Sequence, residues 1–129
     1  PASQYAEWAD TICDGFGISG ESATGVAAAH EWPCRHERDR IYMLLRREGT
    51  VVATALLHTA CGVAGIYGIA VRRAYQRQGL GRLATLVTAH AGAERGATMA
   101  MLQATKEGFP VYERLGFRTI CAFRSWQIV

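Results

Sequence analysis

The pattern of hydrophobic and polar positions changes along the chain, and each change predicts a different kind of element. The first part has helical periodicity interrupted by glycines, and the residue before a proline avoids helical geometry. We therefore expect two helices over residues 3–16 and 21–31, the second ended by Trp32-Pro33 and followed by the polar connector CRHERDR. The next stretches favour strands joined by tight turns, at residues 41–47, 50–60 and 62–71. Three strands joined so closely must lie antiparallel to one another.

Beyond the third strand the period becomes helical. Apolar side chains recur three and four positions apart, which predicts a helix ended by Gly96. The positions that follow this spacing on one predicted face are Leu80, Leu83, Ala84, Val87, Ala91 and Glu94. A buried strand over residues 98–104 follows, and because a helix connects it to strand 62–71, the two strands should be parallel. The remaining predicted elements are a short helix over residues 110–115, ended by Gly116, and a last strand or strand pair over residues 117–129.

These elements predict a fold of class α/β (α+β), with a mixed sheet flanked by helices. Gly62, Gly65 and Gly68 recur within the third strand, and a glycine inside a strand marks a bulge or the close approach of another backbone. The sequence contains no internal repeat, low-complexity tract or linker. We therefore treat residues 1–129 as a single domain.

Composition and charge argue against a membrane-spanning or nucleic-acid-binding protein but do not identify a function. Half of the 129 residues are hydrophobic, as in ordinary soluble domains, and no apolar run approaches the length of a membrane span. The excess of 14 Lys and Arg over 11 Asp and Glu is mild. It lacks the clustering of a nucleic-acid groove but suits a small polyanionic ligand. We expect a cytoplasmic protein, monomeric or homodimeric, that binds neither nucleic acid nor membranes.

The cysteines and histidines favour structural roles over metal binding. The four cysteines are far apart and form no C-x-x-C pair, so reduced, buried thiols are expected, with Cys61 and Cys121 as core residues of strands. His30, Cys34 and His36 form a loose trio without a fourth ligand at a set spacing, and we expect no metal site. The tryptophans are expected to pack in the core or at its rim: Trp8, Trp32 and Trp126.

The stretch QRQGLGRL, residues 76–83, carries the most specific chemistry in the sequence. Main-chain N–H groups at a helix start lack partners inside the helix and lie at the positive end of its dipole, where phosphate binds well. Gly79 and Gly81 leave room for a diphosphate, and Arg77 and Arg82 add positive charge. The same glycines also suit a strand-to-helix turn that only needs an unusual dihedral angle, and spacing alone leaves both interpretations open.

Two motifs together give the chain a resemblance to a known family. The motif Arg/Gln-x-x-Gly-x-Gly/Ala and a later Tyr-x-x-x-Gly-Phe are matched by Gln76, Gly79 and Gly81, and by Tyr112, Gly116 and Phe117. In this order, with a helix and a strand between them, they resemble the GNAT (Gcn5-related) N-acetyltransferase superfamily over residues 41–123. The first strand of that family is not found ahead of Gln4, and we expect a shortened N-terminus.

The resemblance implies an acyltransferase that moves the acetyl group of acetyl-CoA, its co-substrate, to a primary amine by direct attack in a ternary complex. It implies the GNAT fold, in which a central parallel pair of strands splays apart to hold CoA. The CoA arm would pair with the main chain of residues 69–71 and the diphosphate with that of residues 77–82. The implied cofactor-binding residues are Ile69, Ala70, Val71, Arg77, Gln78, Gly79, Leu80, Gly81, Arg82 and Thr105, the last standing where many members have Asn.

Tyr112 is the implied general acid, which would protonate the departing CoA thiolate. Its alternative is a helix tyrosine whose ring packs in the core. The carboxylate base of many members has no counterpart on the two parallel strands, so the base is open between a water chain, His58, Tyr67, Glu107 and an amine that arrives neutral. The acceptor would be a small-molecule or peptide amine. The alternative function is a non-catalytic CoA-binding or regulatory module of the same fold.

Overall fold

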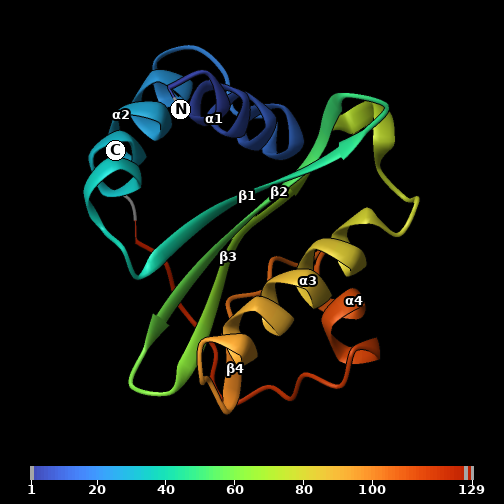
Figure 1. Ribbon diagram of the computed structural model, residues 1–129. Helices are drawn as coiled ribbons and strands as arrows, with labels where there is room; N and C mark the ends of the chain where they lie inside the picture. The colour runs from blue at the N-terminus through green and yellow to red at the C-terminus, as the bar shows by residue number, and fades with distance from the viewer. Residues whose placement is uncertain (1, 127, 129) are drawn as a thin grey trace.

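The computed structural model of the protein describes residues 2–126 and residue 128. Figure 1 shows its elements in chain order. They are α1 (Ala2–Phe16), α2 (Glu21–His36), β1 (Arg40–Arg47), β2 (Thr50–Ala60), β3 (Val63–Val71), the 3-10 turn η1 (Arg73–Tyr75), α3 (Leu80–Glu94), β4 (Met99–Leu102) and α4 (Phe109–Arg114). No helix in the described part of the chain combines the length and the apolar character that crossing a membrane requires.

The strands form one mixed sheet in the order β1-β2-β3-β4. The first three are antiparallel neighbours and β4 lies parallel to β3, as the sequence predicts. The predicted tight turns are confirmed, and each has positive φ at both central residues, at Glu48-Gly49 and at Cys61-Gly62. This geometry matches the twist of the flanking strands, so the hairpins fix the register of the sheet.

Helices cover both faces of the sheet (Figure 1), with α1 and α2 on one face and α3 and α4 on the other. On the first face Trp8 of α1 is buried against Leu56 and Ala70, and its indole Nε1 donates to the carbonyl of Ala55 at 3.2 Å. On the second face Leu80, at the start of α3, packs with Val52 and other residues of β2. Because β2 is buried on both faces, its sequence is almost continuously apolar.

The predicted bulge lies in β3. Leu56 pairs with Tyr67 and Thr54 with Ala70, so β3 carries one residue more than β2 over this interval. Gly68 has φ +57°, and a Cβ there would approach the Trp8 ring at 3.1 Å, so both conformation and space favour glycine. After the bulge β3 stays paired with β2 up to Val71, which lies opposite Ala53.

The inner face of α3 differs from the predicted one. Leu83 and Val87 are half-exposed, whereas Thr85 and Thr88 are fully buried. Each threonine hydroxyl donates to the carbonyl four residues earlier, at 2.8 and 2.7 Å, so these side chains reach the core with their hydrogen bonds satisfied. Near the end of the helix, a Cβ on Gly92 would lie 2.4 Å from the Cβ of Ala64. α3 therefore packs directly on the backbone of the sheet.

Two predictions about helix and strand ends are wrong. α2 does not end at Trp32 but continues through Pro33 to His36. The proline lies close to the end of the helix, so only one internal bond is lost, and its own carbonyl still accepts from Glu37 N–H at 3.0 Å. The last strand, predicted over 117–129, is absent from residues 117–126, while Gln127 and Val129 lie outside the described residues.

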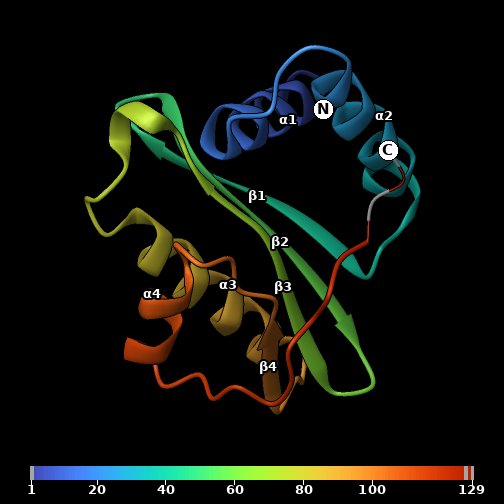
Figure 2. The ribbon, with the colours of Figure 1, turned by 180° about the vertical axis from the view of Figure 1, so that it is seen from behind.

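The segment after α4 is extended but does not join the sheet (Figure 2). Its large apolar residues Ile120, Phe123 and Trp126 recur every third position, a spacing that neither face of a strand matches, and all three are exposed. The burial predicted for Cys121 and Trp126 is therefore wrong. Cys61 is also exposed, because it occupies the turn after β2 rather than a strand.

Candidate functional site

A run of unpaired main-chain donors lies at the start of α3. Gly79 precedes the helix in a left-handed conformation with φ +79°, and no side chain caps the helix. The first N–H of this region to find an acceptor is that of Leu83, which donates to the carbonyl of Gly79 at 3.0 Å. Within the described part of the chain, the N–H groups of residues 77–82 have no hydrogen-bond acceptor. Such a run at the positive end of a helix binds anions.

The loop that leads into these donors is anchored to α1. Arg72 pairs with Asp10 at 2.7 Å, and the carboxylate of Asp14 accepts from the main-chain N–H of Arg73 at 2.9 Å. Gln76, the first residue of the glycine motif, donates from its side-chain amide to the carbonyl of Val71 at 3.1 Å. The same amide lies 3.3 Å from the carbonyl of Gly15 in α1. The motif glutamine thus joins β3, the loop and α1.

Positive side chains surround the donors. Arg77 and Arg82 are exposed, and neither forms an ion pair or side-chain hydrogen bond with any described residue. Arg47, which sequence reasoning missed, reaches from the end of β1 to donate to the side chain of Gln78 at 2.7 Å. Its guanidinium also lies 5.9 Å from the centre of the Tyr75 ring. No local motif marks Arg47, because only the folded sheet brings the β1–β2 turn beside this loop.

The parallel strands separate next to the donors. β3 and β4 pair only from Val63 with Met99 to Ile66 with Leu102, and β3 then continues to Val71 without β4 beside it. The three β3 residues implied by the family resemblance lie in this part: Ile69, Ala70 and Val71. Ala70 is buried and paired with Thr54 of β2, so the side of β3 away from β2 is the one left open.

Tyr112 lies in α4, beyond the end of β4. Its ring packs edge-on against Phe117, with ring centres 6.1 Å apart, and its edge lies close to Gly108. The hydroxyl has no hydrogen-bond partner among the described residues. Burial raises the pKa of Tyr112 above its ordinary value, and the phenol is protonated at neutral pH as in any ordinary tyrosine.

Thr105 shapes the turn that begins α4. Its hydroxyl oxygen accepts from the N–H of Gly108 at 3.1 Å, and its carbonyl accepts from the N–H of Phe109 at 3.0 Å. The family resemblance implies a hydrogen bond from this residue to CoA. The exposed hydroxyl still has its own proton to donate, so its role in the turn does not exclude that bond.

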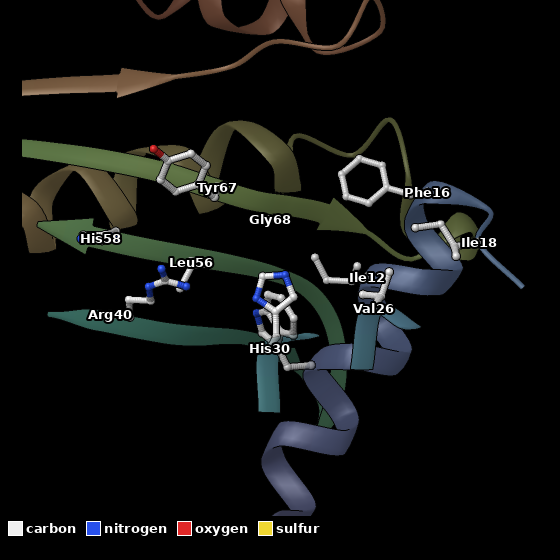
Figure 3. Close-up of a pocket in the computed structure, with 11 residues that line it drawn as sticks. Ile12, Phe16, Ile18, Val26, His30, Arg40, Leu56, His58, Tyr67 and Gly68 are labelled. Atoms are coloured by element: carbon white, nitrogen blue, oxygen red, sulfur yellow. The ribbon is translucent and has the colours of Figure 1, made fainter. Parts of the chain in front are cut away.

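A cavity of about 510 Å³ lies on the other face of the sheet, between the strands and the helices α1 and α2 (Figure 3). Its wall is mainly apolar and aromatic. α1 contributes Trp8, Ile12 and Phe16, and β3 contributes Tyr67 and Gly68 at the bulge. The cavity therefore lies beside the bulge of β3, next to the residue at which β4 ends its pairing with β3.

The polar groups of this wall are few. His58 lines the cavity, and its Nε2 lies 3.5 Å from the carboxylate of Asp39. Of the candidate bases predicted from sequence, His58 and Tyr67 are brought together here, whereas Glu107 lies exposed in the loop before α4 and does not line the cavity. His30 also faces the cavity, with its Nδ1 3.2 Å from the Tyr42 hydroxyl.

The loose trio of possible metal ligands is not assembled into a site. His30 contacts Tyr42, and the Nδ1 of His36 lies 2.8 Å from the carbonyl of Trp32. Burial, and to a smaller extent Arg40, lowers the pKa of His30. Within residues 2–126 and 128, no three His, Cys, Asp or Glu side chains are grouped so that they could hold a metal ion.

The comparisons with known proteins agree with this geometry. The model of the Acetyltransferase (GNAT) family matches residues 5–117. An acetyltransferase from Trypanosoma brucei superposes with a TM-score of 0.75 at 18% identity, over 99% of this chain and 95% of its own. Glucosamine-6-phosphate N-acetyltransferase from Arabidopsis thaliana gives 0.74 at 15% identity, over 97% and 94%. A GCN5-related N-acetyltransferase from Ralstonia eutropha gives 0.72 at 19% identity, over 97% and 93%. At these identities the structures establish the fold, and no curated protein matched the sequence.

Proposed function

Because the chain belongs to the GNAT acetyltransferase family, we propose that it transfers the acetyl group of acetyl-CoA to a primary amine by direct attack in a ternary complex. Acetyl-CoA is the donor that the family generally uses. The observation that carries the proposal is the run of N–H groups from Arg77 to Arg82, which have no acceptor among the described residues. It lies beside the open edge of β3, so a diphosphate and an extended amide-bearing arm find complementary groups in one place.

The proposal gives each predicted cofactor residue a role. The N–H groups of residues 77–82 bind the diphosphate, with charge from Arg77 and Arg82. The open side of β3 over residues 69–71 pairs with the amides of the CoA arm. Thr105 donates its remaining hydroxyl proton to the cofactor. Arg47 reaches this loop as well, and it adds a cation at the same helix start.

The acceptor amine enters from the cavity on the opposite face. Its nitrogen attacks the thioester carbonyl, so the N–C bond forms as the C–S bond breaks. His58, oriented by Asp39, accepts the proton that the nitrogen loses. Tyr112 donates the phenol proton to the departing thiolate. Among the described residues the Nδ1 atom of His58 has no partner, so it is the free atom for this transfer.

Replacement of Tyr112 by Phe tests the assignment of the general acid. The hydroxyl makes no internal hydrogen bond, so the Phe variant should keep the thermal stability of the parent within about 0.5 kcal/mol. Turnover, followed by release of free thiol from acetyl-CoA, should fall by at least about tenfold, with acetyl-CoA affinity unchanged. Turnover within about twofold of the parent would mean that the tyrosine only packs.

The same assay separates an enzyme from a binding module. A parent protein that binds acetyl-CoA in calorimetry but releases no thiol with any amine would refute catalysis and leave the non-catalytic alternative. His58→Gln is the companion variant, and it should lower turnover by at least about tenfold, since it removes the proposed base. Turnover within about twofold of the parent would assign the proton to water or to a neutral amine.

A further inference from the structure

The charge distribution of the cavity restricts what can bind there. Its lining includes no carboxylate among the described residues, and its only permanent charge is the guanidinium of Arg40. That charge is already paired, because Arg40 Nε lies 2.5 Å from Glu37 Oε2, although the angle does not suit a hydrogen bond. Asp39 lies 3.5 Å from His58 but does not line the cavity itself. Among the described residues the wall therefore offers a cationic ligand no carboxylate to contact directly.

The rest of the wall favours apolar contact. Trp8 and Ile12 are almost fully buried, and Leu56 of β2 lies below them. Phe16 and Tyr67 are about half-exposed, at 48% and 44%, so aromatic side chains remain partly open to solvent beside the cavity. Figure 3 shows that Phe16 comes from α1 and Tyr67 from β3. A buried ammonium group without a carboxylate partner is strongly disfavoured in such a place, whereas an apolar body gains from burial.

From this cavity we infer that the acceptor is a primary monoamine with an apolar alkyl or arylalkyl body, and not a polyamine or aminoglycoside. The inference rests on the proposed function, since it assigns the acceptor of that same reaction. The single amine passes its proton to His58, so after attack the amide is neutral and the positive charge lies on the imidazole, beside the Asp39 carboxylate. A second or third ammonium group, by contrast, would have to lie against apolar side chains and the Arg40 guanidinium.

Binding measured without turnover tests the inference. Calorimetry of the full chain, saturated with CoA, is performed with 2-phenylethylamine and with spermidine. We expect 2-phenylethylamine to bind at least about tenfold more tightly. In the series butylamine, pentylamine and hexylamine, affinity should rise about fourfold with each methylene group. Equal or tighter binding of spermidine, or no binding of any of these amines, would overturn the inference.

A charge-introducing variant gives a second readout. In Phe16→Glu the new carboxylate stands at a half-exposed position of the wall, so it stays hydrated and the helix is retained. Spermidine affinity should rise by about fivefold and 2-phenylethylamine affinity should fall, as expected for one partly exposed charge pair. Leu86→Glu is the matched control, because Leu86 is 43% exposed on α3, on the other face of the sheet. An equal effect of both variants would show that general charge, and not the cavity, sets the preference.

Thiol release separates this inference from the proposed function. Release with spermidine but not with 2-phenylethylamine would overturn the monoamine inference and leave acetyl transfer standing. Tight binding of 2-phenylethylamine without thiol release from any amine would refute acetyl transfer, while the preference of the cavity would be upheld by the binding data.

Discussion

Replacement of Gly81 by Val separates cofactor binding from folding. Gly81 is the second residue of α3, and its φ lies outside the left-handed region. A Cβ there would meet only Val71 Cγ2, at 3.9 Å, which is an ordinary contact distance. Valine is also a slightly better helix former than glycine, by a few tenths of a kcal/mol on host–guest scales. The free energy of unfolding should therefore stay the same or rise slightly.

The same side chain interferes with the diphosphate. Its two methyl groups stand beside the N–H groups of Gly81 and Arg82, which have no acceptor within the described residues. Each charge-assisted hydrogen bond of this kind contributes about 1.5–3 kcal/mol. Loss of one such bond weakens binding by at least about tenfold, and loss of two by several hundredfold.

Calorimetric titration with acetyl-CoA measures the effect, and chemical denaturation checks the fold. Gly25→Val is the matched control, because Gly25 also lies inside a helix, α2, where a Cβ would meet nothing within 4 Å. The control should keep the acetyl-CoA affinity of the parent. If Gly81→Val is folded and its dissociation constant stays within about twofold of the parent, the start of α3 does not bind the diphosphate.

Two further predictions concern stability. Gly92→Val should lower the free energy of unfolding, measured by urea titration, by about 1–3 kcal/mol. A Cβ at this position would lie 2.4 Å from the Cβ of Ala64, so α3 must move off the sheet. An unchanged urea midpoint of unfolding would contradict this packing. The pKa of His30 is lowered in the folded chain, first by burial and then by Arg40. Below pH 6.5, the ordinary pKa of histidine, His30 therefore binds more protons in the unfolded chain than in the folded one. The melting temperature should therefore fall as pH drops below 6.5, and His30→Gln should show a smaller fall; equal slopes would assign the acid sensitivity to other groups.

Local rules predicted most of the elements of this fold. Period and turn chemistry placed the hairpins, the helix after the glycine motif and the parallel strand. The repeated glycines indicated the bulge that the structure has at Gly68. These features depend on neighbouring residues, so a single sequence contains them. The buried face of α3 was not predicted, because Thr88 is a polar residue. Its hydroxyl can be buried only because it donates to the carbonyl of Ala84 once the helix has formed.

Features that depend on distant contacts could not be predicted in this way. Asp10 and Asp14 are ordinary polar positions of a helix until folding brings them to Arg72 and Arg73. The cavity and the His58–Asp39 pair likewise combine residues from separate elements. The motifs therefore indicated the residues of the proposed cofactor site, while the cavity proposed for the acceptor became visible only in the fold.

The position of α1 has a consequence for redesign of this enzyme. One side of the helix forms the cavity wall through Ile12 and Phe16, while its carboxylates and C-terminal carbonyl hold the loop that precedes the N–H groups of residues 77–82. A chimaera that imports α1 from a relative to change acceptor preference would therefore also remove the support of this loop. Retention of Asp10 and Asp14 in the imported helix should preserve acetyl-CoA affinity, and a chimaera without them should lose it. Residues on the cavity side of α1 can thus be exchanged, whereas residues on its loop side should be kept.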